Sequence, residues 1–331
     1  MKKFINNHGI QWATIWVRPL KNNQRYILAA ILFMLLAGCC GCIQDHQEGI
    51  HIVATFYPLA FFAREIGGDY VIVTQLVPDN TELHAWQPST ADIVAANEAD
   101  IILYNGAGLD QWFVSDVLPS IDRQHKSIVN TTEGATLLKH SQNDQEHHET
   151  EHKESLYDPH TWISPFVAQQ QAESIYNALI TNDPTHEDYY TQRWALLQQH
   201  FITLDTMYMD NLSTAQQDVI FLTHEAFGYL AERYGFQQQG VIGLSADEQP
   251  STATIAELVD NMLDQERYIL YVDPMYADDY AQTLKNTLEA QTGQTVHVLT
   301  LYLMAGEIDG MDYFDQQRQN LENLTIGLEA T

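Results

Sequence analysis

Residues 51–77, HIVATFYPLAFFAREIGGDYVIVTQLV, contain one complete strand–helix–strand unit. The runs 51–56 and 71–77 are short and rich in β-branched residues, which is typical of buried strands. The segment between them, 58–66, carries apolar residues at helical spacing. A helix between two such strands is the βαβ unit of a parallel sheet, so we predict an α/β fold.

The same alternation of strand-like and helix-like segments continues along the chain and falls into two groups. The remaining predicted strands are 101–106, 126–130, 218–223, 240–244, 268–273 and 296–301. An apolar-periodic segment at 89–98 separates strands of the first group. We therefore predict two α/β lobes, each built on a parallel sheet with helices on its faces.

Two helical segments lie between the predicted lobes. The first, 164–181, follows Ser164-Pro165, a favourable capping pair for a helix start. The second, 187–212, carries apolar residues spaced three and four apart, which predicts one buried stripe along a long helix. The residues of this stripe are Trp194, Leu197, Phe201, Leu204 and Tyr208. We predict that this long, rigid helix joins the two lobes.

We predict that the chain has five segments and one loop. The predicted divisions are a signal peptide at 1–38, a tether at 39–50, a first lobe at 51–163, connecting helical segments at 164–212 and a second lobe at 213–331, with a loop rich in histidine and acid at 139–155.

The charge of the chain limits its partners. Its 331 residues include 44 Asp and Glu against 15 Lys and Arg. So few basic residues could not neutralise a row of phosphates, which argues against nucleic acid as a partner. A negative surface attracts cations, although it does not identify a function.

The first 38 residues differ in composition from the rest. They contain five basic side chains and no acidic one, and an apolar run at 27–37 leads into LAGC at 36–39. The run is short for a membrane span and suits a signal peptide. Because LAGC resembles a lipobox, we predict lipidation of Cys39 and an extracytoplasmic, membrane-anchored protein. The basic segment is long for a signal, so translation could start downstream of Met1.

All the cysteines lie at this junction, at positions 39, 40 and 42. The chain after them has no thiol for a disulfide, a metal site or a nucleophile. Histidine is the remaining strong nitrogen ligand, and three histidines occupy informative positions. His84 lies past the strand 71–77, His224 follows the strand 218–223, and His160 lies between the lobes. Ligands of open parallel sheets bind beyond the carboxyl ends of strands.

Several motifs, in order, resemble the metal-binding lipoproteins of ABC importers in the zinc and manganese cluster. They are IVATFYPLAFFAREIGGDYVIVTQLVPDNTELHAWQPSTADI, ADIILYNGAGLDQWF, DPHTWISP, LTHEAFGYLAERYGF, GLSADEQPS and GMDYFDQQRQNLENL. The resemblance runs from about residue 51 to the C-terminus. It implies two α/β lobes joined by a long helix, with a metal held between them.

The resemblance also implies the ligands. The family's first, second and third metal ligands fall on His84, His160 and His224. The third is His in zinc-type members and Glu in manganese-type members, so the resemblance favours Zn²⁺. Three imidazoles also form a usual partial zinc shell. The fourth ligand stays open between water and Glu307, and Asp273 is a weaker candidate with an expected structural role.

The loop before His160 contains four further histidines, His140, His147, His148 and His152, among acidic residues. Zinc-type members of the family often carry such a loop, which implies weak zinc collection, although a solvated insertion without a role is an equal alternative. The letters HETEH at 148–152 match a zinc-peptidase signature. Their polar flanks provide no apolar face for the required helix, so we interpret the match as chance.

The sequence thus predicts a lipid-anchored binding protein, not an enzyme, that delivers Zn²⁺ to an ABC permease and, through it, to its ATPase. Manganese, iron or nickel as cargo is the first alternative. A zinc hydrolase using HETEH, and a storage or adhesin role without transport, are further alternatives.

Overall fold

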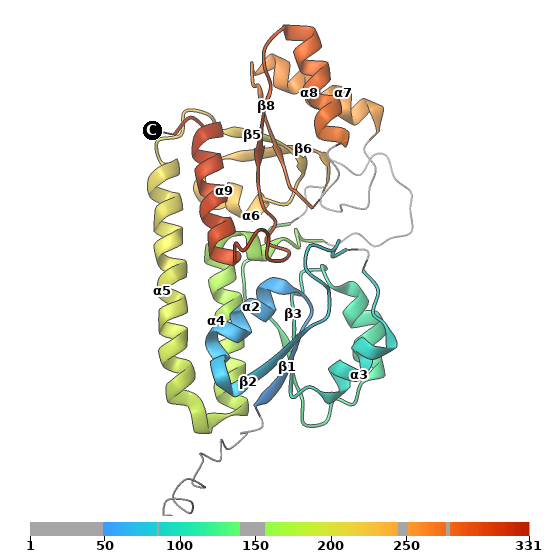
Figure 1. Cartoon of the computed structure of the whole chain (residues 1–331), viewed down its shortest axis with the longest axis vertical. Coiled ribbons are helices and arrows are strands. Elements are labelled where there is room, and N and C mark those ends of the chain that lie inside the picture. The colour runs from blue at the N-terminus through green and yellow to red at the C-terminus, as the bar shows by residue number, and fades with distance from the viewer. Residues whose placement is uncertain (1–48, 85, 140–155, 244–250, 276–278, 331) are drawn as a thin grey trace, which may run out of the picture. The chain divides into compact units, whose positions relative to one another are not determined.

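A computed structural model describes residues 49–84, 86–139, 156–243, 251–275 and 279–330. The described chain contains two four-stranded sheets, and every strand pairing in them is parallel. Figure 1 shows the two sheets in separate lobes, each with helices against its faces. The predicted fold class of two parallel α/β lobes is therefore confirmed.

The first sheet has the strand order β2-β1-β3-β4. Its strands are β1 (Ile50–Ala54), β2 (Val71–Gln75), β3 (Ile101–Tyr104) and β4 (Ser127–Asn130). The chain passes from β1 to β2 through α2 (Tyr57–Gly67) and the short η1 (Gly68–Tyr70), as the opening motif predicts. It passes from β2 to β3 through α3 (Thr90–Glu98) and from β3 to β4 through η2 (Phe113–Val117) and η3 (Leu118–Ser120).

The second sheet has the order β6-β5-β7-β8. Its strands are β5 (Val219–His224), β6 (Gln237–Ile242), β7 (Ile269–Val272) and β8 (His297–Thr300), and its helices are α6 (Gly228–Tyr234), α7 (Thr252–Asp264) and α8 (Asp279–Thr292). All six residues of β5 are buried, as expected for a central parallel strand. β6 begins three residues earlier than predicted, because an edge strand tolerates the polar run Gln237–Gln239.

Three long helices lie beside the two sheets (Figure 1). They are α4 (Pro165–Asn182), α5 (Glu187–Leu212) and α9 (Tyr313–Gly327), with η6 (Pro184–His186) between the first two. Along α5 the predicted apolar stripe is buried. This helix packs against α2 and α4 at one end and against α9 and α6 at the other (Figure 1). It therefore contacts elements of both lobes.

The start of α4 departs from the expected capping pair. Ser164 is the N-cap and Pro165 the first helical residue, but the serine side chain makes no capping hydrogen bond. Its hydroxyl is buried and has no hydrogen-bond partner. The helix start therefore relies on the fixed backbone angle of Pro165.

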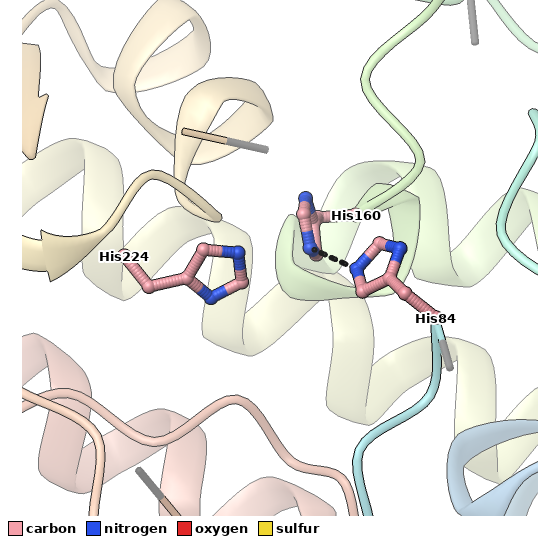
Figure 2. Close-up of side chains that lie close together, drawn as sticks. All are labelled: His84, His160 and His224. Atoms are coloured by element: carbon pink, nitrogen blue, oxygen red, sulfur yellow. Dashed lines mark hydrogen bonds between the residues drawn. The ribbon is translucent and has the colours of Figure 1, made fainter. Parts of the chain in front are cut away.

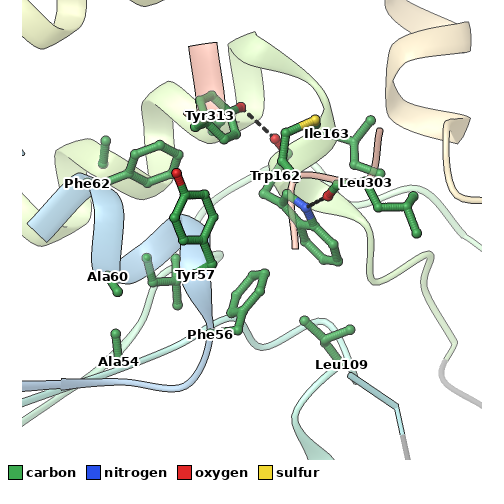
Figure 3. Close-up of a cluster of buried hydrophobic side chains, with 14 of the residues drawn as sticks. Ala54, Phe56, Tyr57, Ala60, Phe62, Leu109, Trp162, Ile163, Leu303 and Tyr313 are labelled. Carbon is green, nitrogen blue, oxygen red and sulfur yellow. Dashed lines mark hydrogen bonds between the residues drawn. The ribbon is translucent and has the colours of Figure 1, made fainter. Parts of the chain in front are cut away.

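Aromatic side chains make up much of the core beside the three-residue turn η5 (Thr161–Ile163). Trp162 contacts Phe56 at 4.8 Å between ring centroids and donates from Nε1 to the Leu303 carbonyl at 2.7 Å. The Tyr313 hydroxyl donates to the Trp162 carbonyl at 2.7 Å (Figure 3). The residue two positions after His160 is thus fixed to the chain that follows β8.

The signal peptide with Cys39, most of the tether and residues 140–155, including HETEH, lie outside the described residues. Among the helices that the structure does describe, none has both the length and the apolar character required to span a membrane.

Candidate metal-binding site

The structure brings together the three histidines that the sequence analysis singled out. His84 lies in the chain after β2, His160 immediately precedes η5, and His224 is the last residue of β5 rather than the residue after it. Figure 2 shows their rings turned toward a common space. The first lobe thus supplies two imidazoles, one of them at its end just before α4, and the second lobe supplies the third.

The distances are short enough for one ion to be shared. One nitrogen of each ring lies within 4.8 Å of the nitrogens of the other two. The two Nε2 atoms of His84 and His160 are 3.3 Å apart and share a hydrogen bond (Figure 2). Nitrogens about 2.1 Å from a tetrahedral zinc ion lie about 3.4 Å apart. The pair therefore already has nearly the spacing that one zinc ion requires.

His160 is oriented by a neighbouring carboxylate. Asp158 Oδ1 accepts hydrogen bonds at 2.9 Å from both the ring Nδ1 and the main-chain N–H of His160. Because an ionised carboxylate only accepts, Nδ1 carries the proton and the lone pair of Nε2 faces the other histidines. Burial, together with the nearby His84, lowers the pKa of His160 well below its ordinary value. The ring is therefore neutral and able to bind a metal.

The second lobe holds Asp158 in turn. The Tyr229 hydroxyl donates to the Asp158 carbonyl at 2.7 Å. A Cβ added at Gly228 would lie 2.5 Å from Asp158 Oδ2. Because Gly228 has no side chain, the start of α6 can approach the carboxylate closely. Asp158 was not among the residues predicted for the site. The available signal was a carboxylate two residues before a ligand histidine in DPH.

The residues on either side of His160 are fixed by Asn105, at the end of β3. Its Nδ2 donates to the Pro159 carbonyl at 3.0 Å, and its Oδ1 accepts from Thr161 Oγ1 and Gln171 Nε2, each at 2.9 Å. Asn105 is fully buried, and these bonds satisfy its amide. The backbone at His160 is thus held from both sides.

His84 has weaker support than His160. It is half-buried, and its main-chain N–H donates to Glu82 Oε1 at 2.9 Å. Two residues later Trp86 packs edge-on against Trp112, with 4.5 Å between ring centroids. This aromatic contact attaches the His84 segment to the first lobe.

His224 is buried beside a small cavity that is also lined by Asp273 and Leu303. Both oxygens of Asp273 accept main-chain N–H groups, from Met275 and from Leu303, each at 2.7 Å. Burial raises the pKa of Asp273 to about 7. The two oxygens of Asp273 thus bind main-chain N–H groups, in agreement with the structural role expected of this residue.

No carboxylate of the described residues joins the three histidines within the spacing that groups them. The Glu307 side chain is exposed, and its main-chain carbonyl accepts from Asn80. The fourth position of a tetrahedral shell is thus not supplied by Glu307 in this arrangement.

Two parallel α/β lobes, with a cluster of histidines contributed from both, define a two-lobed binding protein of the metal-ion type. The family model described as "Zinc-uptake complex component A periplasmic" matches residues 52–327. The chain belongs to this family, which confirms the resemblance seen in the sequence motifs.

Individual relatives agree with this assignment. The chain is 30% identical over 310 residues to the high-affinity zinc uptake system protein ZnuA of Bacillus subtilis, covering 92% of this chain and 96% of that protein. It is 30% identical over 305 residues to the zinc-binding lipoprotein AdcA of Streptococcus pneumoniae, covering 90% of this chain but only 59% of the longer AdcA.

Solved structures give the same result. The metal-dependent lipoprotein YcdH of Bacillus subtilis aligns with a TM-score of 0.70 at 28% identity, covering 84% of this chain and 98% of that one. The Zn(II)-bound ZnuA-like domain of Streptococcus pneumoniae AdcA aligns with a TM-score of 0.70 at 26% identity, covering 85% and 99%. These similarities confirm the predicted fold.

Proposed function

We propose that this chain is an extracytoplasmic solute-binding protein that captures Zn²⁺ between its lobes through His84, His160 and His224. The observation that carries the proposal is the convergence of three imidazoles from separate segments, with ligand nitrogens within 4.8 Å of one another. Two of these histidines are almost fully buried, at 1% and 3% exposure.

The donor set favours zinc over the other candidate cargoes. Manganese and magnesium prefer oxygen ligands, whereas imidazole suits zinc, copper, nickel and iron. The curated relatives are named for zinc, which selects it within the nitrogen-preferring group. A water molecule is the proposed fourth ligand, since Glu307 is turned to solvent in this structure.

The proposal has three further parts. The protein delivers zinc to an ABC permease and its ATPase, it is anchored through a lipid on Cys39, and it has no enzymatic activity. Support comes from the family assignment, from relatives named as a zinc uptake protein and a lipoprotein, and from the LAGC motif. We propose that residues 51–163 and 213–331 form the two lobes and that residues 164–212 form the connecting segment.

The proposal is tested by the metal content of natively purified protein, followed by calorimetric titration of the metal-free protein with zinc and with manganese. We expect one tightly bound zinc per chain and much weaker manganese binding. Tight manganese binding at the same site would mean that manganese, rather than zinc, is the cargo. The absence of any tightly bound metal would reject the proposed function. Mass spectrometry of the mature N-terminus tests the lipid on Cys39, and a soluble protein beginning elsewhere would reject it.

A further inference from the structure

The chain that follows β8 crosses from the second lobe toward the segments that carry His160 and His84. It is fixed first at Leu303, whose N–H donates to Asp273 of its own lobe at 2.7 Å. The carbonyl of the same residue accepts from Trp162, as Figure 3 shows. One residue of this crossing segment therefore joins the second lobe to the backbone beside His160.

Two residues further along, the same segment meets the loop that leads to His84. The main-chain N–H of Asn80 donates to the Ala305 carbonyl at 3.1 Å, and its side-chain Nδ2 donates to the Glu307 carbonyl at 3.0 Å. Asn80 has a φ of 55°, a left-handed conformation that Asn adopts more readily than most residues. Both donors thus face the second lobe.

Gly306, between the two accepting carbonyls, allows the close approach. A Cβ added there would lie 2.5 Å from the Asp79 Cβ and 2.8 Å from the Asn80 nitrogen. Main-chain atoms cannot yield at such distances without the two segments moving apart. The glycine and the asparagine are therefore independent observations of one fitted contact.

The first-lobe side of the contact is braced from β2. Gln75 Nε2 donates to the Val77 carbonyl and to Asp79 Oδ1, each at 2.7 Å. His84 follows Asn80 by four residues in the same loop. A contact at Asn80 therefore limits how far His84 can move from His224, which belongs to the lobe on the other side of the contact.

We propose that Asn80 and Gly306 are positioning residues for His84, and that the contact of residues 79–80 with residues 305–307, which we call the inter-lobe latch, sets the rate at which the bound metal leaves. This inference rests on the proposed function. His160 and His224 are held by buried elements, so departure of the ion requires His84 to move, and the latch opposes that movement.

The test measures zinc release and zinc binding by stopped flow, with an excess of a chromogenic chelator reporting release. Gly306→Ala separates the two segments by steric contact, and Asn80→Asp replaces the Nδ2 donor with an acceptor facing the Glu307 carbonyl. We expect each to raise the dissociation rate about tenfold, the size of effect that follows from losing one hydrogen bond. Affinity should fall by the same factor because the association rate changes little.

Matched variants control for side effects. Gly243→Ala adds a Cβ that meets nothing within 4 Å, and Asn286→Asp adds a charge on α8 while keeping its acceptor for Gln282. Both should release zinc like the parent. The negative charge added by Asn80→Asp does not repel a zinc cation, so faster release in that variant would reflect the broken contact with the Glu307 carbonyl. Asn80→Gly keeps the main-chain bond and should give an intermediate rate.

Unchanged release from both Gly306→Ala and Asn80→Asp would overturn the latch. So would equal increases in the binding and release rates, because unchanged affinity would mean that the contact does not position His84. A parent protein that binds no zinc would instead reject the proposed function, so the two failures can be told apart.

Discussion

His160 and His84 lie 3.3 Å apart through their Nε2 atoms, yet the two are supported in different ways. His160 is buried, its ring is fixed by Asp158, and its flanking residues are tied to the fully buried Asn105. His84 is half-buried, and its loop is held by Glu82, by a tryptophan contact and by the latch at Asn80. The site thus combines one rigid ligand with one held mainly at the surface.

We infer that the rigid ligand mainly supports zinc affinity and that the more mobile ligand mainly determines the rate of zinc release. A binding protein that must later release its ion needs ligands that are preorganised, and at least one that can move at low cost. The rigid part of the site is built around Asn105, where buried hydrogen bonds join this residue to Thr161 of η5 and to Gln171 of α4. The mobile part is expected where the hydrogen bonds are exposed to water, on the loop before His84.

The largest expected effect is the loss of a ligand. We expect His84→Ala, His160→Ala and His224→Ala each to weaken zinc binding by more than the roughly 10–100-fold typical of outer-shell changes, because water replaces an imidazole poorly. Competition with a chelator of known affinity measures the loss. A variant that binds zinc like the parent would remove that histidine from the site.

The next effect compares the two supporting carboxylates. Asp158→Ala should lower zinc affinity roughly 10–100-fold, because the ring of His160 loses the acceptor that fixes its orientation. Glu82→Gln keeps an oxygen acceptor for the part-buried hydrogen bond from the His84 N–H, so affinity should change by less than about threefold. Titration of both variants checks this order. Equal losses of zinc affinity in the two variants would contradict the distinction between the rigid support of His160 and the weaker support of His84.

A smaller effect concerns the stability of the metal-free protein. Since the pKa of His160 is lowered from its ordinary value of 6.5, the unfolded chain binds a proton below that pH that the folded protein does not. This residue therefore makes the free energy of unfolding fall with falling pH, by at most about 1.4 kcal/mol per pH unit.

Two buried carboxylates oppose this trend. Burial raises the pKa of Asp110 to about 6 and that of Asp273 to about 7, so both bind protons in the folded state and add stability as the pH falls toward 4. The contribution of His160 is therefore measured by comparing two proteins. The free energy of unfolding in urea is determined for the parent and for His160→Gln between pH 7 and pH 5, in the presence of a chelator. The parent should lose more stability than the variant over this range, and parallel curves would argue against a neutral, buried His160.

The smallest effect on the tight site is expected from the histidine-rich loop. Lys139 and Tyr157, which border it, form an antiparallel bridge, so a deletion of residues 140–152 leaves the two ends of the loop paired. The tight one-to-one zinc site should be unchanged, and additional weak zinc binding should vanish. Calorimetry at high zinc reports both. Loss of tight binding in a folded deletion variant would mean that loop histidines belong to the site.

The strands and the three histidines could be predicted from the sequence because both follow from local patterns. Buried parallel strands are continuous apolar runs, and the histidines lie at or near strand ends or in a recognisable motif. The edge strand β6 was placed late because its first residues are polar. Asp158, Asn105, Asn80 and Gly306 were not assigned roles, because each depends on a partner that is distant in the chain or on a close backbone approach visible only in three dimensions.

The histidine cluster implies that one zinc ion is held by imidazoles from both lobes. A crystal structure of the zinc-loaded protein, with anomalous data collected at the zinc edge, tests it most directly. We expect one strong peak within about 2.0–2.1 Å of one nitrogen atom of each of His84, His160 and His224. A zinc ion bound chiefly by carboxylates, or by residues of one lobe alone, would contradict it.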